Sequence, residues 1–249
     1  RPKPTVEHDA STVVFYPDTF VNYNEPALGI ATVEVLEKAG YRVILAEPRR
    51  CCGRPFISKG MLKEARAAAA FNIEHLSVYA ERGWPIVGCE PSCLLSFRDD
   101  YLELVDDKRA QKVAEHVFLI DEFLVRENEA GRLNLDFKDI RQKIEVHGHC
   151  HQKALMGTGP TVAALNMVPG YDAEALNTGC CGMAGSFGYE REHYDLSLKI
   201  GGDRLFPAIN GLDEHTVCAA PGTSCRHQIS DGTGHSAKHP IEYIRDAME

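Results

Sequence analysis

Short apolar runs alternate along this chain with longer segments whose apolar residues recur at helical spacing. Runs rich in β-branched and aromatic residues predict strands, and amphipathic segments that end at glycine predict helices. The strands expected are Val13–Tyr16, Tyr41–Leu45, Pro85–Val87, Ile144–His147, Ala173–Leu176 and Thr216–Ala219. The helices expected are Pro26–Ala39, Met61–Glu81, 92–105, 109–128, Thr161–Val168 and 189–200. This alternation predicts an α/β fold with mainly parallel sheets.

Three sequence landmarks occur twice, which indicates an internal repeat of about 130 residues. Cys51-Cys52-Gly53 corresponds to Cys180-Cys181-Gly182, 129 residues later. Cys93 corresponds to Cys225 after 132 residues, and Asp18-Thr19 corresponds to His149-Cys150 after 131 residues. Two copies of such a repeat nearly fill the chain. We therefore expect two Rossmann-like βα halves.

A polar stretch over residues 129–142 marks the boundary between the halves. We expect a first repeat over residues 1–135, with an incomplete cysteine set because Thr19 replaces its first cysteine, and a second, complete repeat over residues 136–249. Ligands of open α/β sheets sit beyond the carboxyl ends of the strands. Since each landmark cysteine follows a predicted strand, the cysteines of each half should converge at one edge of its sheet.

The charge and composition of the chain argue against a nucleic-acid partner and against a membrane-spanning segment. The formal net charge is −9 and no stripe of lysine and arginine is present, which argues against nucleic acid. No apolar run is long enough to span a membrane, and no secretory signal is visible. We expect a cytoplasmic protein. The chain begins with Arg1 rather than Met, which indicates a processed product or a piece of something longer.

Nine cysteines are the most informative feature of the composition. An odd number in a long chain without an export signal disfavours a disulfide framework and favours metal binding or catalysis. A single nucleophilic cysteine would not need four repeated positions. Four converging thiolates suit either tetrahedral zinc or an iron–sulfur cluster.

The second repeat favours a 4Fe–4S cluster held by Cys150, Cys180, Cys181 and Cys225. Adjacent cysteines chelate a single metal ion poorly, because their side chains diverge, but they can bind two different irons of one cluster. The glycine-rich stretch 182–188 would let backbone N–H groups approach the sulfur atoms. Zinc in place of iron remains an alternative at this stage.

The first repeat offers fewer ligands. Cys51, Cys52 and Cys93 form a candidate second metal site, for zinc or another metal, with Cys89 as a possible fourth ligand. The alternative is a copy that has lost its metal. Cys218 falls within a predicted strand and is expected to be a buried apolar side chain.

Histidines surround the first cysteine of the second repeat. In an extended segment His147, His149 and His151 would share one face, which makes His149 and His151 candidate metal ligands. The competing interpretation is that they donate hydrogen bonds or tune the electrostatics around the cysteine. Arg54 and Arg226 lie next to landmark cysteines and either offset negative charge or lie on the surface.

The sequence resembles the cysteine-rich CCG domain family, in which a cysteine, a Cys-Cys-Gly triplet and a C-terminal cysteine motif occur, usually in two copies. It looks most like the C-terminal iron–sulfur portions of FAD-linked oxidoreductases that act on D-lactate, D-2-hydroxyglutarate or glycolate. The iron–sulfur components of anaerobic glycerol-3-phosphate dehydrogenase and heterodisulfide reductase are more distantly similar. The stretches that carry the resemblance are 15–20, 52–55, 90–93, 147–153 and 179–188.

The resemblance implies an electron-transfer module that passes electrons from a flavin towards a quinone or another carrier. It implies partners, namely an FAD-binding dehydrogenase domain or subunit and a ferredoxin-like domain, and the FAD would be bound there rather than by this chain. It also allows attachment to the inner membrane face through such a partner. Each C-terminal motif here has one cysteine fewer than the fullest family pattern, which fits one four-cysteine site in the second repeat.

Two other functions stay open on the sequence. One is a zinc-stabilised structural or docking domain without a redox role. The other is a disulfide reductase that uses a cluster and a free thiol.

Overall fold

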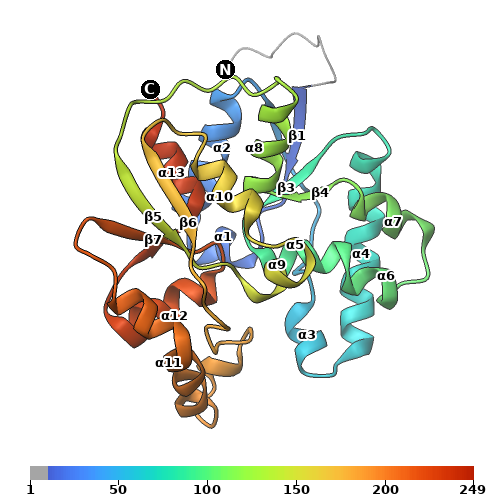
Figure 1. Ribbon diagram of the computed structural model, residues 1–249. Helices are drawn as coiled ribbons and strands as arrows, with labels where there is room; N and C mark the ends of the chain where they lie inside the picture. The colour runs from blue at the N-terminus through green and yellow to red at the C-terminus, as the bar shows by residue number, and fades with distance from the viewer. Residues whose placement is uncertain (1–10) are drawn as a thin grey trace.

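Two four-stranded sheets, both entirely parallel, organise the part of the chain that the computed structural model describes, residues 11–249 (Figure 1). The first sheet has the order β2-β1-β3-β4, and its strands are β1 (Thr12–Phe15), β2 (Arg42–Leu45), β3 (Ile86–Gly88) and β4 (Val117–Leu119). The second has the order β6-β5-β7-β8, and its strands are β5 (Gln142–Val146), β6 (Tyr171–Ala175), β7 (Thr216–Ala219) and β8 (Ala237–Lys238). The expected α/β architecture of two Rossmann-like halves is confirmed.

The strand register repeats as well as the strand order. Val14 lies opposite Ile44 on one side, and its counterpart Ile144 lies opposite Ala173. On the other side Val14 pairs with Ile86, as Ile144 pairs with Val217. The repeat seen in the cysteines therefore extends to the backbone pairing of both sheets.

Helices cover both faces of each sheet. Those of the first half are α1 (Thr19–Tyr23), α2 (Pro26–Lys38), α3 (Arg54–Ser58), α4 (Leu62–Ala80), α5 (Pro91–Arg98), α6 (Asp100–Leu104), α7 (Lys108–Ala114) and α8 (Ile120–Glu129). Those of the second half are α9 (Cys150–Leu155), α10 (Gly159–Leu165), α11 (Tyr194–Asn210), α12 (Thr223–Thr233) and α13 (Pro240–Ala247), with a short 3₁₀ turn at Phe187–Tyr189.

The halves share a central core. Helix α2 packs on α13 and α8 packs on α10, so that these four helices lie between the two sheets (Figure 1). One apolar cluster includes Val13 and Phe123 of the first half together with Ile144 and Ile244 of the second. Two outer clusters lie on the far faces of the sheets, and each contains cysteines of its own half.

The prediction of one helix over 109–128 was wrong. The chain forms α7, then the buried strand β4, then α8. Val117–Leu119 is a three-residue apolar run, which periodicity alone cannot separate from a turn of a buried helix. Pairing with β3 decides its conformation, because the run completes the edge of the first sheet.

Among the described residues, no helix is long and apolar enough to cross a membrane.

Candidate metal centre

The landmark residues occupy equivalent places in the two halves. Thr19 and Cys150 are the first residues of α1 and α9, which follow the first strand of each sheet. Cys93 and Cys225 are the third residues of α5 and α12, which follow the third strand. The Cys-Cys-Gly triplets follow the second strands. The cysteines therefore lie beyond the carboxyl ends of the strands, where ligands of such sheets bind.

The glycine of each triplet is required by the backbone. Gly53 and Gly182 have φ angles of +83° and +96°, in the left-handed region that favours glycine. A Cβ at Gly182 would lie 2.1 Å from the carbonyl oxygen of Ser197 on α11. The turn that directs the two preceding cysteines therefore tolerates no side chain at this position.

Four cysteine sulfurs of the second half form a continuous row. The Sγ atoms of Cys225 and Cys181 are 3.6 Å apart. Cys181 is in hydrogen-bond contact with Cys180, which in turn contacts Cys150. Cys181 and Cys225 are buried, whereas Cys150 and Cys180 are partly exposed, and all four are free thiols. The row runs from the surface into the outer core of this half.

Contacts between neighbouring thiols shift the pKa of each cysteine in this row. Hydrogen bonds from Cys150 and Cys181 hold the pKa of the Cys180 thiol well below its usual range, and the Gly182 N–H also donates to this sulfur over 3.3 Å. The neighbouring Cys181 and His147 lower the pKa of Cys225. The same contacts raise the pKa of Cys150 and Cys181. Thiolates are the metal-binding form of cysteine, and the hydrogen bonds to Cys180 favour that form there.

His147 joins this group, although the sequence pattern predicted only His149 and His151 as histidine ligands. Its ring is fully buried, and its Nδ1 lies 2.7 Å from the Thr178 hydroxyl. Its Nε2 is buried and has no nitrogen or oxygen partner among the described residues. One ligand atom each of His147, Cys181 and Cys225 lie within 4.8 Å of one another. A buried imidazole nitrogen facing thiols fits a bound metal or cluster.

Two further side chains fix the backbone segments that carry Cys180 and Cys150. The Lys153 ammonium donates to the carbonyls of Thr178 and Gly179, each at 2.9 Å, and so fixes the loop that leads into Cys180. His149 caps α9, because its Nδ1 accepts the N–H of His151 at 3.2 Å.

The expectation that His147, His149 and His151 share one face was wrong, because Cys150–Leu155 is a helix rather than an extended segment. His151 points to the other half, where its Nε2 lies 3.4 Å from Asp99. Burial and the nearby Arg54 lower its pKa. Arg54 itself pairs with the Asp100 carboxylate at 2.6 Å rather than with a cysteine.

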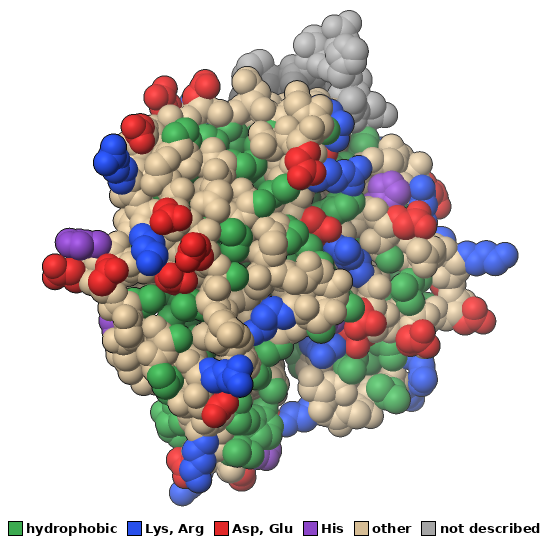
Figure 2. Space-filling view, in the orientation of Figure 1, with side chains coloured by type: hydrophobic (Ala, Val, Ile, Leu, Met, Phe, Trp, Pro, Cys, Tyr) green, Lys and Arg blue, Asp and Glu red, His purple; other side chains and the backbone are tan. Residues whose placement is uncertain are grey.

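A cavity of about 630 Å³ opens onto the exposed end of the row. Cys150, Cys180 and Cys181 line one wall, and Arg54 and Lys59 of the first half line another. Figure 2 shows the surface hollowed between the lobe of α11 and α12 and the lobe of α3 and α4. A small molecule or a protein loop can therefore approach the sulfurs from this side.

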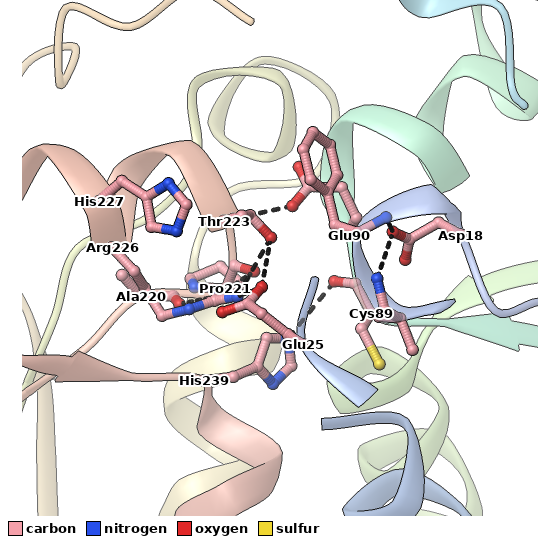
Figure 3. Close-up of polar contacts among 12 residues, drawn as sticks. Asp18, Glu25, Cys89, Glu90, Ala220, Pro221, Thr223, Arg226, His227 and His239 are labelled. Atoms are coloured by element: carbon pink, nitrogen blue, oxygen red, sulfur yellow. Dashed lines mark hydrogen bonds and ion pairs between the residues drawn. The ribbon is translucent and has the colours of Figure 1, made fainter. Parts of the chain in front are cut away.

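Carboxylates of the first half hold the helix that carries Cys225 (Figure 3). Glu90, which is 2% exposed, accepts the N–H of Thr223 at the start of α12 over 2.8 Å. Glu25 accepts the Thr223 hydroxyl at 2.8 Å and pairs with Arg226 at 2.6 Å. Arg226 is thus a buried anchor between the halves rather than a surface residue, and it also donates to two backbone carbonyls.

The first half places its cysteines differently. The Sγ atoms of Cys52 and Cys93 are 3.2 Å apart, and Cys51 contacts Cys52 but is exposed. Cys89 lies in the central core, 3.1 Å from the Thr32 hydroxyl, and is not part of this group. Cys218 is a buried side chain of β7, as expected.

Comparison with known proteins agrees with this architecture. The model of a family described as "CCG: Cysteine-rich domain" matches residues 12–98. One of the subunits of anaerobic glycerol-3-phosphate dehydrogenase from Escherichia coli (strain K12) is 32% identical over 95% of this chain. D-2-hydroxyglutarate dehydrogenase from Haemophilus influenzae is 29% identical over 93% of it. The matched region spans only 59% and 23% of those two relatives.

A shorter relative is matched over most of its length. Lactate utilization protein A from Exiguobacterium sp. is 30% identical, and the match covers 89% of both chains. A crystal structure of a hypothetical protein from Helicobacter pylori has the same fold, with a TM-score of 0.58 and 12% identity over 98% of this chain and 50% of its own. This chain therefore belongs to the family of lactate utilization protein A, and its residues 12–98 match the CCG cysteine-rich domain.

Proposed function

We propose that Cys150, Cys180, Cys181 and Cys225 hold an iron–sulfur cluster of the 4Fe–4S type. The observation that carries this proposal is the row of four sulfurs, two of them buried, which ends at a buried imidazole nitrogen. Such a donor set fits a cluster because thiolate is the usual ligand of its irons. When bound, the cluster would supply one-electron transfer.

The groups around the four cysteines would tune and shield a bound cluster. The Gly182 N–H donates to the Cys180 sulfur, and such hydrogen bonds to sulfur tune the reduction potential. His147 is held by Thr178 with its Nε2 towards Cys225 and Cys181, so that it can donate to sulfur or act as a ligand. Burial of Cys225 and Cys181 excludes water from the inner end of the row.

We further propose that the whole protein is a flavin-dependent 2-hydroxy-acid oxidoreductase in which this chain passes electrons from the flavin to an acceptor. The names of the relatives, D-2-hydroxyglutarate dehydrogenase and lactate utilization protein A, support this substrate class. The flavin would be bound by a partner domain or subunit, with a ferredoxin-like domain between the two. The cavity beside Cys150 and Cys180 gives a quinone or another carrier access to the sulfurs.

A zinc-stabilised docking domain is the second candidate function. It is favoured by one observation, the compact group of His147, Cys181 and Cys225, because three such ligands are common in zinc sites.

Metal and sulfide content of the anaerobically isolated chain tests both functions. The cluster predicts iron and acid-labile sulfide, a brown colour and absorbance at about 400 nm. Cys181→Ser should lose iron and sulfide, whereas Cys218→Ser, a matched change of a buried cysteine outside the row, should keep both. Stoichiometric zinc without iron would establish the docking domain instead. Unchanged iron in Cys181→Ser would overturn the ligand assignment.

A further inference from the structure

A second row of sulfurs lies in the first half. Its inner pair, Cys52 and Cys93, is 3% and 4% exposed, and the two Sγ atoms are 3.2 Å apart. Its outer member, Cys51, is exposed and in hydrogen-bond contact with Cys52. The row thus leads from solvent to a buried pair of thiols.

The residues that complete the ligand set in the second half are replaced here. Thr19 stands at the position of Cys150, and its hydroxyl contacts Cys51. Tyr16 stands at the position of His147, since the Tyr16 N–H binds the Val87 carbonyl as the His147 N–H binds that of Ala219. The row therefore has neither a fourth thiol nor an imidazole nitrogen.

Two tyrosines and an asparagine beside this row have their partners within the protein. The Tyr16 hydroxyl donates to the Arg50 carbonyl and the Tyr101 hydroxyl to the Cys52 carbonyl, each at 2.7 Å. Asn72 accepts the Arg50 N–H at 2.8 Å and donates to the Cys51 carbonyl. The buried rings of Tyr16 and Tyr101 fill the space that surrounds Cys52. The residues present do not fit an iron–sulfur cluster, although they hold Cys52 and Cys93 face to face.

We propose that Cys52 and Cys93 form a redox-active dithiol that closes to a disulfide. A disulfide bond is about 2.05 Å long, so the two sulfurs need to approach each other by only about 1 Å. This inference is independent of a cluster in the second half, because none of the residues that carry it belongs to that site.

The oxidant would be a small disulfide, and the exchange balances. Cys51, the exposed thiol of the row, attacks the small disulfide, and its proton leaves with the sulfur that is displaced as the first thiol. Cys52 then attacks the Cys51 sulfur and releases the second thiol, and Cys93 attacks the Cys52 sulfur and restores the Cys51 thiol. Two cysteine S–H bonds are broken, one S–S bond forms between Cys52 and Cys93, and the small disulfide is reduced to two thiols.

Differential alkylation of the full chain, equilibrated with defined ratios of oxidised to reduced glutathione, tests the proposal. Under oxidising conditions we expect a mass lower by about 2 Da and a cross-linked peptide pair that contains Cys52 and Cys93. This readout uses the wild-type chain and does not depend on the folding of a variant. Cys51→Ser should slow the closure at least about tenfold without changing its equilibrium, whereas Cys218→Ser should change neither.

Three results would overturn the proposal. One is alkylation of both Cys52 and Cys93 under fully oxidising conditions. Another is a final disulfide between Cys51 and Cys52. The third is protection of the three cysteines by iron or zinc that a chelator removes, which would mean that this half holds a metal after all.

Discussion

Removal of the Glu25 carboxylate should destabilise the contact between the halves. Glu25→Ala leaves the guanidinium of Arg226, which is 6% exposed, without its anionic partner, and it leaves the Thr223 hydroxyl without its acceptor. The backbone carbonyls of Ala220 and Pro221 still accept from Arg226 at 2.9 Å. The guanidinium therefore stays in place but loses the negative charge that offsets its burial.

The magnitude follows from this geometry. Breaking a fully buried ion pair by removing one partner costs about 3–5 kcal/mol. Glu25 is 27% exposed, so water can reach the space that its carboxylate leaves and can solvate part of the cation. We therefore expect the free energy of unfolding to fall by about 2–3 kcal/mol.

Urea unfolding followed by far-UV circular dichroism, at equal metal content, measures this loss. Glu47→Ala is the matched control, because its pair with Arg49 is formed by a carboxylate that is 68% exposed, and it should cost less than about 1 kcal/mol. The double variant Glu25→Ala with Arg226→Met should recover part of the stability, since no buried charge remains unpaired. A loss from Glu25→Ala no larger than that of the control would refute the reasoning.

Three other changes have expected outcomes. Burial and the neighbouring Glu90 raise the pKa of the Asp18 carboxyl to about 7, so between about pH 4 and pH 7 the folded chain keeps a proton that the unfolded chain has released. The free energy of unfolding should therefore fall with rising pH across that window, with a slope of up to about 1.4 kcal/mol per pH unit. Asp18→Asn should remove this slope, as measured by urea unfolding at several pH values. An unchanged slope would mean that other groups cause the pH dependence. Gly182→Ala should cost about 3 kcal/mol and most of the bound metal, whereas Gly185→Ala, with a φ of +71° but open space around it, should cost about 1 kcal/mol and keep the metal; equal losses would contradict the steric argument. Lys153→Met removes two hydrogen bonds to the loop before Cys180, so a chelator should strip metal from it faster than from the wild type, and equal rates would show that the loop is held by other contacts.

The sequence predicted those features that depend on local patterns. The strand that begins the first half is an apolar run, the one that begins the second alternates apolar Ile144 and Val146 with polar residues, and the two Cys-Cys-Gly triplets mark turns that favour glycine. These local patterns could be recognised without the fold. The two short outer strands were missed. Strand β8 has only two residues, and β4 is stable as a strand because it pairs with β3.

The other residues of the site were harder to predict from the sequence than its cysteines. His147 was predicted to share a face with His149 and His151 because the start of α9 at Cys150 was not recognised. The residue that caps α9 is His149 rather than one of the usual capping residues. Glu25 gave no signal in the sequence, and Glu90 stood out only as part of the stretch 90–93, with no indication of its role. Each is a lone acidic residue in the sequence, and its partner lies more than about 100 residues away, where only the packing of one half on the other brings the two together.

The two halves are thus equivalent in topology but unequal in chemistry, and the second depends on the first. Helix α12 carries Cys225, yet its first N–H and its buried arginine are satisfied by Glu90 and Glu25 of the first half. The central core is shared as well, so a cut near residue 135 would expose the apolar faces of α2 and α8 on one side and of α10 and α13 on the other. A first repeat without a complete ligand set is therefore not dispensable, because it supplies the anchors that hold one cysteine of the second repeat in place.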